Sequence, residues 1–329
     1  MKTKLKSSLS SKKTFLILSF LCIFFAIICC FFGEITLPLA AAFLAVIYVF
    51  DIKEKRRISY IVSAGVIIIN IASILLKLSS SLFGIEAVLL AIIIYFAFSR
   101  QTSKSDASYL MTAILAVFIA LGALLLAVMI QGEVSIEAVS SFYSSIINYL
   151  REAFIDSALL MYGEMLKASG AEFTGEDFGA VFDTAVSLII SYVIIIAFLL
   201  VGFTMKLFGA ITARLAEDNR EVMSWRFAPT NVFAYFYLII TFASIFLNSS
   251  TDLLSISILN LYYVFMVIFA YVGFNFSVVN LAKKFSRLIS FVLPTVAIVI
   301  FPSFAMQLLA VMGVFFTFAS NREKTQYDS

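Results

Sequence analysis

The sequence contains no histidine and few charged residues. Without histidine, the chain has neither the imidazole base of a serine or cysteine hydrolase nor a histidine-ligated metal centre. Asp, Glu, Lys and Arg make up 13% of the residues, against about 25% in an ordinary soluble domain. With 62% hydrophobic residues over a length of 329, this composition excludes a disordered chain and a water-soluble globular protein.

Cysteine is scarce as well. The three cysteines, Cys22, Cys29 and Cys30, all lie inside the first long apolar stretch, where neither a disulfide framework nor a metal cluster is plausible. We interpret them as small hydrophobic residues and expect no cofactor and no metal. The chain has no GxxxxGK[ST] sequence and no GxGxxG after a strand, so any ATP dependence would come from a partner. We expect no enzymatic activity and no nucleic-acid partner.

Long apolar stretches dominate the rest of the chain, and a helix needs about 20 mostly apolar residues to cross a bilayer. The sequence therefore predicts an all-α, polytopic integral membrane protein with about ten transmembrane helices and one external amphipathic helical segment. The predicted spans are Thr14–Phe32, Ile35–Phe50, Ile58–Leu78, Leu82–Phe98, Tyr109–Ile130, Thr184–Lys206, Asn231–Leu247, Leu253–Phe276, Leu288–Phe301 and Ser303–Ala319. The first is interpreted as an uncleaved helix, because a signal peptide has an apolar region of only about 7 to 15 residues.

The last two spans leave two alternatives open. Leu288–Ala319 contains Pro294 and Pro302, and it fits either a hairpin that turns at Pro302 and Ser303 or a single kinked helix. We favour the hairpin, because one helix of this length would measure roughly 48 Å. The hydrocarbon core of a bilayer is only about 30 Å thick.

Lysine and arginine set the expected orientation, because both concentrate in cytoplasmic segments. With ten crossings and the amino terminus inside, all but three of the 23 basic residues fall on the cytoplasmic side. The exceptions are Lys77, Arg151 and Lys167. We therefore expect a multi-pass protein of the bacterial plasma membrane with both termini in the cytoplasm.

The connection Gln131–Asp183 is rich in acidic residues and is expected to lie outside. Polar residues recur at steps of three and four along it, and apolar residues do so on another face, which predicts an amphipathic helix. Ser135 is its expected N-cap, and Thr174 with Asp177 predicts a capping box. The segment is either a helix in the outer interface or a lid over a central cavity. It separates an N-terminal membrane half (1–130) from a C-terminal half (184–329), with 131–183 between them.

Few polar side chains lie at depth. Lys77 and Glu86 are expected to form an ion pair near the outer surface, and the lack of a carboxylate in the middle of a span argues against a proton-coupled antiporter with an Asp or Glu relay. Buried amides either line a solute cavity or hydrogen-bond between helices. The candidate solute-binding residues are Asn70, Asn260, Asn275 and Gln307.

Small residues follow one face of the fifth span, which lets another helix approach closely. They are Ala113, Ala116, Ala120, Ala123 and Ala127. This stripe either packs inside the chain or docks another membrane protein. Ala270, Gly273 and Ser277 form a shorter version in the eighth span.

The layout resembles the YybS-like family of bacterial membrane proteins, which is classed as a domain of unknown function. The resemblance rests on the turn Trp225–Pro229 opening into Asn231–Leu247, on the external segment, and on the terminal hairpin that ends in Leu308–Phe318 and Asn321–Glu323. It implies a distant similarity to the substrate-binding S components of energy-coupling-factor vitamin transporters, and to membrane scaffolds of cell-wall synthesis.

Two functions are therefore expected. The first is small-solute binding or transport, with a membrane-protein partner that supplies energy. The second is a scaffold without transport, which would use the alanine stripe to recruit a membrane protein for envelope growth or signalling. In both cases the lipid bilayer surrounds the chain.

Overall fold

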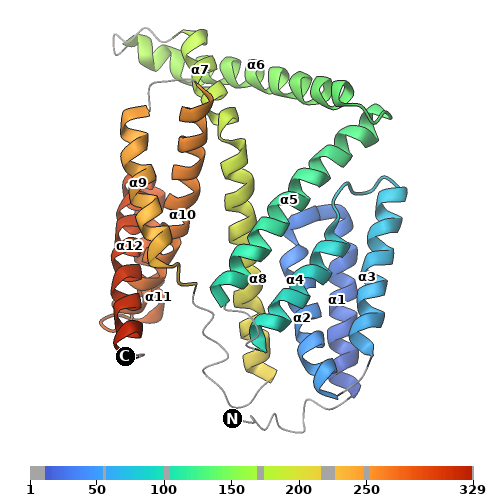
Figure 1. The fold of residues 1–329 in the computed structure, drawn as a ribbon. Helices are drawn as coiled ribbons and strands as arrows, with labels where there is room; N and C mark the ends of the chain where they lie inside the picture. Colours follow the sequence, from blue (N-terminus) through green and yellow to red (C-terminus); the bar gives the residue numbers. More distant parts are fainter. Residues whose placement is uncertain are drawn as a thin grey trace. The chain divides into compact units, whose positions relative to one another are not determined.

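A computed structural model describes residues 12–54, 57–99, 104–168, 174–215, 227–247 and 252–327, and these ranges form helices and turns without a strand (Figure 1). The all-α prediction is confirmed. Among the described residues, six helices are long and apolar enough to cross a membrane: Thr14–Ile35, Ile58–Leu75, Ser105–Gln131, Ile189–Ala213, Leu253–Leu281 and Pro302–Ser320. The other four predicted spans fall in shorter apolar helices, Leu37–Asp51, Phe83–Phe98, Asn231–Phe246 and Arg287–Ile300, so a total of ten spans stays a prediction.

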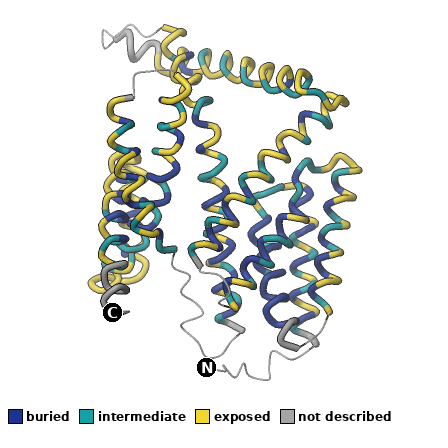
Figure 2. The backbone as a smooth tube through the Cα atoms, in the orientation of Figure 1, coloured by how far each residue is buried: buried dark blue, intermediate teal, exposed yellow. Residues whose placement is uncertain are grey.

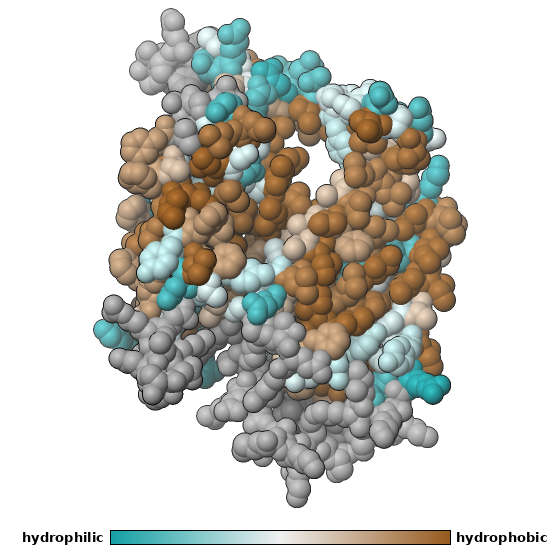
Figure 3. Space-filling model, in the orientation of Figure 1, coloured by the Kyte–Doolittle hydropathy of each residue, from teal (hydrophilic) through white to brown (hydrophobic). Residues whose placement is uncertain are grey.

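Apolar side chains on the surface agree with a membrane environment. On the helix Ile58–Leu75, for example, Ile61, Ile68 and Leu75 lie seven residues apart and expose 70%, 64% and 77% of their surface. Exposed and apolar residues coincide along many of the helices, as comparison of the burial colouring with the hydropathy colouring shows (Figures 2 and 3). A continuous apolar surface of this kind is stable only against lipid or another apolar partner.

The chain forms two compact units, which do not follow the predicted division at residues 130 and 184. The first contains 1–102, 110–189 and 200–224, and the second contains 103–109, 190–199 and 225–329. The external segment groups with the first unit. The helices α5 (Lys104–Gln131) and α8 (Ile189–Leu215) contribute residues to both units.

The first unit is built around α2 (Leu37–Glu54), which packs against α1 (Lys12–Phe32), α3 (Ile58–Leu75) and α4 (Phe83–Phe98). Small side chains on α2 permit this close packing, since its alanines are fully buried: Ala40, Ala41, Ala42 and Ala45. The three cysteines of α1 are free and buried, as expected of small hydrophobic residues.

A buried carboxylate fixes the connection from α2 to α3. Asp51 accepts hydrogen bonds from the backbone N–H groups of Ile58 and Ser59 at 3.2 and 2.8 Å, and from the Ser59 hydroxyl. The N–H groups at the start of a helix have no partner within the helix, and a negative charge is favourable there. Asp51 thus caps α3 from the preceding helix.

The external segment forms two helices, α6 (Ile136–Ala168) and α7 (Gly175–Ser187). The Ser135 hydroxyl accepts a hydrogen bond from the Ala138 N–H at 3.1 Å, so the predicted N-cap is confirmed. The predicted capping box of Thr174 and Asp177 also forms. Arg151 on α6 pairs with Asp183 on α7 through two hydrogen bonds of 3.0 and 3.3 Å, which joins the two helices.

The predicted start of the sixth span at Thr184 is wrong. Thr184 belongs to α7, and the apolar helix α8 begins only at Ile189, after a break at Leu188. The sequence hides this break because the apolar residues continue across it. The ion pair of Asp183 with Arg151 gives the last turn of α7 a polar partner on α6.

The capping box gives α7 a pH dependence. Hydrogen bonds from the Thr174 N–H and hydroxyl lower the pKa of the Asp177 carboxyl. Its stabilising effect is therefore complete above the ordinary aspartate pKa of about 3.9 and is lost as the pH falls through the lower folded value. We expect amide exchange in α7, corrected for the intrinsic pH effect, to speed up below about pH 4. In the Thr174→Ala variant, the amides of α7 should exchange fast already at neutral pH. Equal protection of α7 in the wild type and the variant would contradict a stabilising role of the capping box.

The second unit consists of α9 (Asn231–Leu247), α10 (Leu253–Leu281), α11 (Arg287–Ile300) and α12 (Pro302–Tyr327), together with the starts of α5 and α8. The Ser105 hydroxyl of α5 donates to the Ala228 carbonyl at 2.8 Å, just before α9. The core of the unit gathers side chains from three of the helices, among them Tyr237, Phe269 and Leu309.

Helices α10 and α12 make the closest approach in this unit. An added Cβ on Gly273 would collide with the Leu309 carbonyl, and one on Gly313 would collide with the Phe269 carbonyl. The two glycines therefore let the backbones touch. The Ala270–Gly273–Ser277 stripe of α10 thus serves packing inside the chain, at least at Gly273.

The terminal region forms two helices rather than one kinked helix. The break falls at Phe301, whose φ and ψ of −129° and 65° are not helical, and α11 packs against α12. Pro302 then opens α12, where its missing N–H costs no hydrogen bond. Two packed helices are therefore confirmed over one kinked helix, with the break one residue before the predicted place, and their crossing of the membrane as two spans stays a prediction.

Candidate functional site

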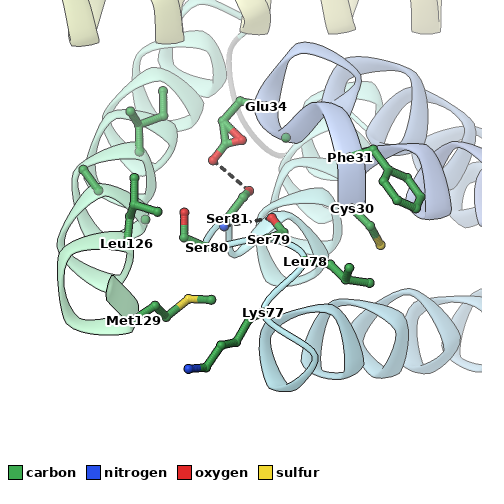
Figure 4. Close-up of a pocket in the computed structure, with 14 residues that line it drawn as sticks. Cys30, Phe31, Glu34, Lys77, Leu78, Ser79, Ser80, Ser81, Leu126 and Met129 are labelled. Carbon is green, nitrogen blue, oxygen red and sulfur yellow. Dashed lines mark hydrogen bonds between the residues drawn. The ribbon is translucent and has the colours of Figure 1, made fainter. Parts of the chain in front are cut away.

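A cavity of about 380 Å³ lies in the first unit, among apolar helices. Its walls come from the α1–α2 turn, the α3–α4 turn and the second half of α5 (Figure 4). Its polar lining consists of Glu34, Lys77 and the serines Ser79, Ser80 and Ser81. Apolar residues of α5, such as Ile119 and Leu126, close the opposite wall.

Two left-handed residues shape the turns. Gly33 has a φ of +56° and opens the short 3-10 turn that carries Glu34 between α1 and α2. Lys77 has a φ of 55°, and its N–H donates to the Ile74 carbonyl at 3.0 Å, while the Leu78 N–H donates to the Ser73 carbonyl at 2.8 Å. This pair of bonds is a Schellman motif, in which glycine is the usual left-handed residue.

A chain of hydrogen bonds links α3 to the cavity. The Asn70 amide donates to the Ser81 carbonyl at 2.8 Å and accepts from the Gly84 N–H at 3.1 Å. The Ser81 hydroxyl in turn donates to Glu34 Oε1 at 2.8 Å. A Cβ on Gly84 would lie 2.7 Å from the Asn70 Cβ, so glycine is needed for this approach. Asn70 therefore positions the turn that holds Glu34.

A second carboxylate is buried in the first turn of α4. Glu86 of α4 has no exposed surface, and neither of its oxygens has a hydrogen-bond partner. Glu34 Oε2 is also buried without one. The bond from Ser81 places Glu34 at the start of α4, and Glu86 lies in the first turn of the same helix. Within the described part of the chain, three carboxyl oxygens of these two residues are thus buried without a donor.

The predicted ion pair of Lys77 and Glu86 does not form. Lys77 is exposed at the cavity, and its amine points away from Glu34, whereas Glu86 is completely buried without a hydrogen bond (Figure 4). The left-handed turn at Lys77 carries the side chain outward. The sequence spacing placed both residues at the same end of their spans, but it did not show which way they face.

The other predicted amides lie in the second unit and serve local structure. Asn260 of α10 accepts from the Ser191 N–H and hydroxyl at 3.0 and 2.6 Å, which joins α10 to α8. The Asn275 amide donates to the Tyr271 carbonyl of its own helix at 2.8 Å. Gln307 is exposed and hydrogen-bonded to a tyrosine hydroxyl. Asn70 belongs to the first unit, so the four candidates do not gather within one unit.

The alanine stripe of α5 is largely open. Ala113, Ala120 and Ala123 are exposed, Ala116 is half-buried, and Ala127 is fully buried. The Ala123 carbonyl accepts a hydrogen bond from the Tyr143 hydroxyl of α6. Packing inside the chain therefore uses only part of the stripe.

Glu34 and its serine partner are not among the residues predicted from the sequence. Glu34 lies between two long apolar runs, next to Gly33. Because one predicted span ends at Phe32 and the next begins at Ile35, Glu34 falls in the connection between them and resembles a solvated loop residue. An acidic residue in so short a connection was the available signal.

Comparison with protein-family models, curated proteins and solved structures finds no match to this chain. The resemblance to the YybS-like family therefore stays a prediction. Of its motif Trp225–Pro229, residues 225 and 226 lie outside the described residues.

Lys77 offers a test of the local geometry. Lys77→Gly is expected to be at least as stable as the wild type, because glycine removes a left-handed penalty of about 1 kcal/mol. Lys77→Ala removes the same charge but keeps the penalty, so it should be the less stable variant in detergent unfolding. If both variants unfold alike, the left-handed turn is not a source of strain.

Proposed function

We propose that the chain binds, and transports, a small polar solute in the cavity lined by Glu34. The observation that carries this proposal is a hydrogen-bonded carboxylate facing a cavity within an apolar helical unit. A carboxylate and three serine hydroxyls suit a cationic or hydroxylated group. The Lys77 amine provides a second charge of opposite sign at the same cavity.

In the ten-span topology that we propose, the α1–α2 and α3–α4 turns lie outside the cytoplasm, and both termini lie within it. The cavity then receives its solute from the external side of the plasma membrane. Charge segregation along the sequence supports this orientation. Helix α6 exposes Leu150 and Phe154, as expected of a helix lying in the membrane interface.

A stability screen tests the solute site. Purified protein in lipid nanodiscs is heated with a panel of small polar compounds, including amines, polyols and amino acids. At least one compound is expected to raise the melting temperature of the wild type, because a ligand that binds only the folded state stabilises it. The Glu34→Gln variant should lose the shift, and a matched change at exposed Glu137 should keep it. Equal shifts in all three proteins would place the site elsewhere.

Partner docking through α5 is the second candidate function, and the exposure of Ala113, Ala120 and Ala123 favours it. We expect Ala116→Leu and Ala120→Leu to break a complex with another membrane protein without harming the fold, because bulky side chains prevent close helix approach. Co-purification from the native membrane measures this. Misfolded variants would instead assign the stripe to internal packing.

A further inference from the structure

The carboxyl groups of Glu34 and Glu86 are a costly feature of the first unit. Burial of an ionised carboxylate costs roughly several kcal/mol of hydration free energy, unless a hydrogen-bond donor or a cation offsets this cost. Glu34 has the Ser81 hydroxyl on one oxygen, and no donor among the described residues reaches Glu86. A fully buried polar group without a partner indicates a missing ion, proton or water.

The surrounding groups supply no such partner. Helix α1 presents the buried thiols Cys29 and Cys30, which add no positive charge, and the Cys29 thiol accepts from the Thr36 hydroxyl at 3.3 Å. The side chains of α5 at the cavity are uncharged. Lys77 is the basic residue of the cavity lining, and it is not paired with either carboxylate.

Helix α2, which packs against α4, brings no nearby charge either. Its described ionisable side chains, Tyr48 and Asp51, are hydrogen-bonded to Ser63 and Ser59 at the other end of the helix. The two carboxyl groups must therefore be balanced by something that enters the site. The cavity beside Glu34 offers the route, because Glu34 belongs to its lining.

We propose that Glu34 and Glu86 share one monovalent cation, H⁺ or Na⁺, which reaches them through the cavity. Three unpartnered carboxyl oxygens and the Ser81 hydroxyl are the available ligands, and oxygen is the donor that both ions accept. Two carboxylates at one helix end can hold one proton between them or bind one small cation in its place. This site goes beyond solute binding, and it supplies a means to couple a solute to an ion gradient.

Infrared difference spectroscopy of the full chain in nanodiscs tests the pair without any solute. In choline chloride at pH 7, the wild type is expected to show the C=O stretch of a protonated carboxylic acid. Glu86→Gln should abolish this band, because Glu34 alone keeps a hydroxyl donor and loses the carboxylate with which it shares the proton. Glu137→Gln, on the exposed face of α6, is the matched control and should leave the band unchanged.

The salt dependence separates the two ions. If NaCl removes the band and choline chloride does not, Na⁺ displaces the proton and the site binds either ion; if NaCl has no effect, the site holds a proton. Glu34→Gln provides a second variant, in which the band should persist at a shifted frequency because Glu86 stays buried. The proposal is overturned if the wild type shows no such band and no effect of Na⁺. It is equally overturned if the band is unchanged in both glutamate variants.

Discussion

Alanine at Gly273 or Gly313 is expected to separate α10 from α12 and to lower the free energy of unfolding by about 3 kcal/mol or more. The added methyl group would overlap a backbone carbonyl of the facing helix, and a backbone atom cannot rotate away as a side chain can. The contact between these helices is the main packing of the second unit, so the loss affects its core around Phe269.

Titration with a denaturing detergent measures this change. Gly65→Ala is the matched control, because an added Cβ there meets nothing within 4 Å in a helix of similar apolar character. Alanine has the higher helix propensity, so the control should lose no stability. If Gly273→Ala is as stable as the control, the two backbones do not touch.

The second large effect is expected from Asn70→Leu, which should weaken solute binding about tenfold or more while the protein still inserts. Leucine has a similar size but leaves the Ser81 carbonyl and the Gly84 N–H without their partner. The α3–α4 turn then loses its anchor, and Ser81 no longer holds Glu34 in place. A tenfold loss of affinity equals about 1.4 kcal/mol.

Asn275→Leu separates this account from the sequence-based hypothesis, which expects both asparagines to be essential. Asn275 donates only to its own helix, in the other unit, so its replacement should leave binding at the Glu34 cavity unchanged. The compound found in the stability screen serves as the probe, titrated against both variants in nanodiscs. Loss of binding in Asn275→Leu with normal binding in Asn70→Leu would contradict the cavity assignment.

Most of the fold could be predicted from local sequence signals. Runs of apolar residues predict helices because a lipid-exposed backbone must satisfy its own hydrogen bonds. The caps at Ser135 and Thr174 were also predictable, since each depends on residues three positions apart. The start of α8 was not, because the break at Leu188 lies inside an apolar run, where no turn residue marks it.

The site could be predicted only in part. Asn70 was identified as a deep amide, and its importance follows from the turn that it anchors rather than from direct contact with a solute. Glu34 and Glu86 are far apart in the sequence, and only the packing of α4 against α1 and α2, with the Ser81–Glu34 bond, places both residues at the start of α4. No local sequence pattern predicts that these two residues lie near each other in the folded chain.

Native mass spectrometry of the chain, released gently from its own membrane, tests the central claim most directly, because it weighs bound small molecules and bound proteins at once. The account predicts a stoichiometric small-molecule adduct on the wild type that is lost from Glu34→Gln. A protein partner without any small-molecule adduct, and without an ATPase-linked subunit in the complex, would contradict solute binding and favour the scaffold function.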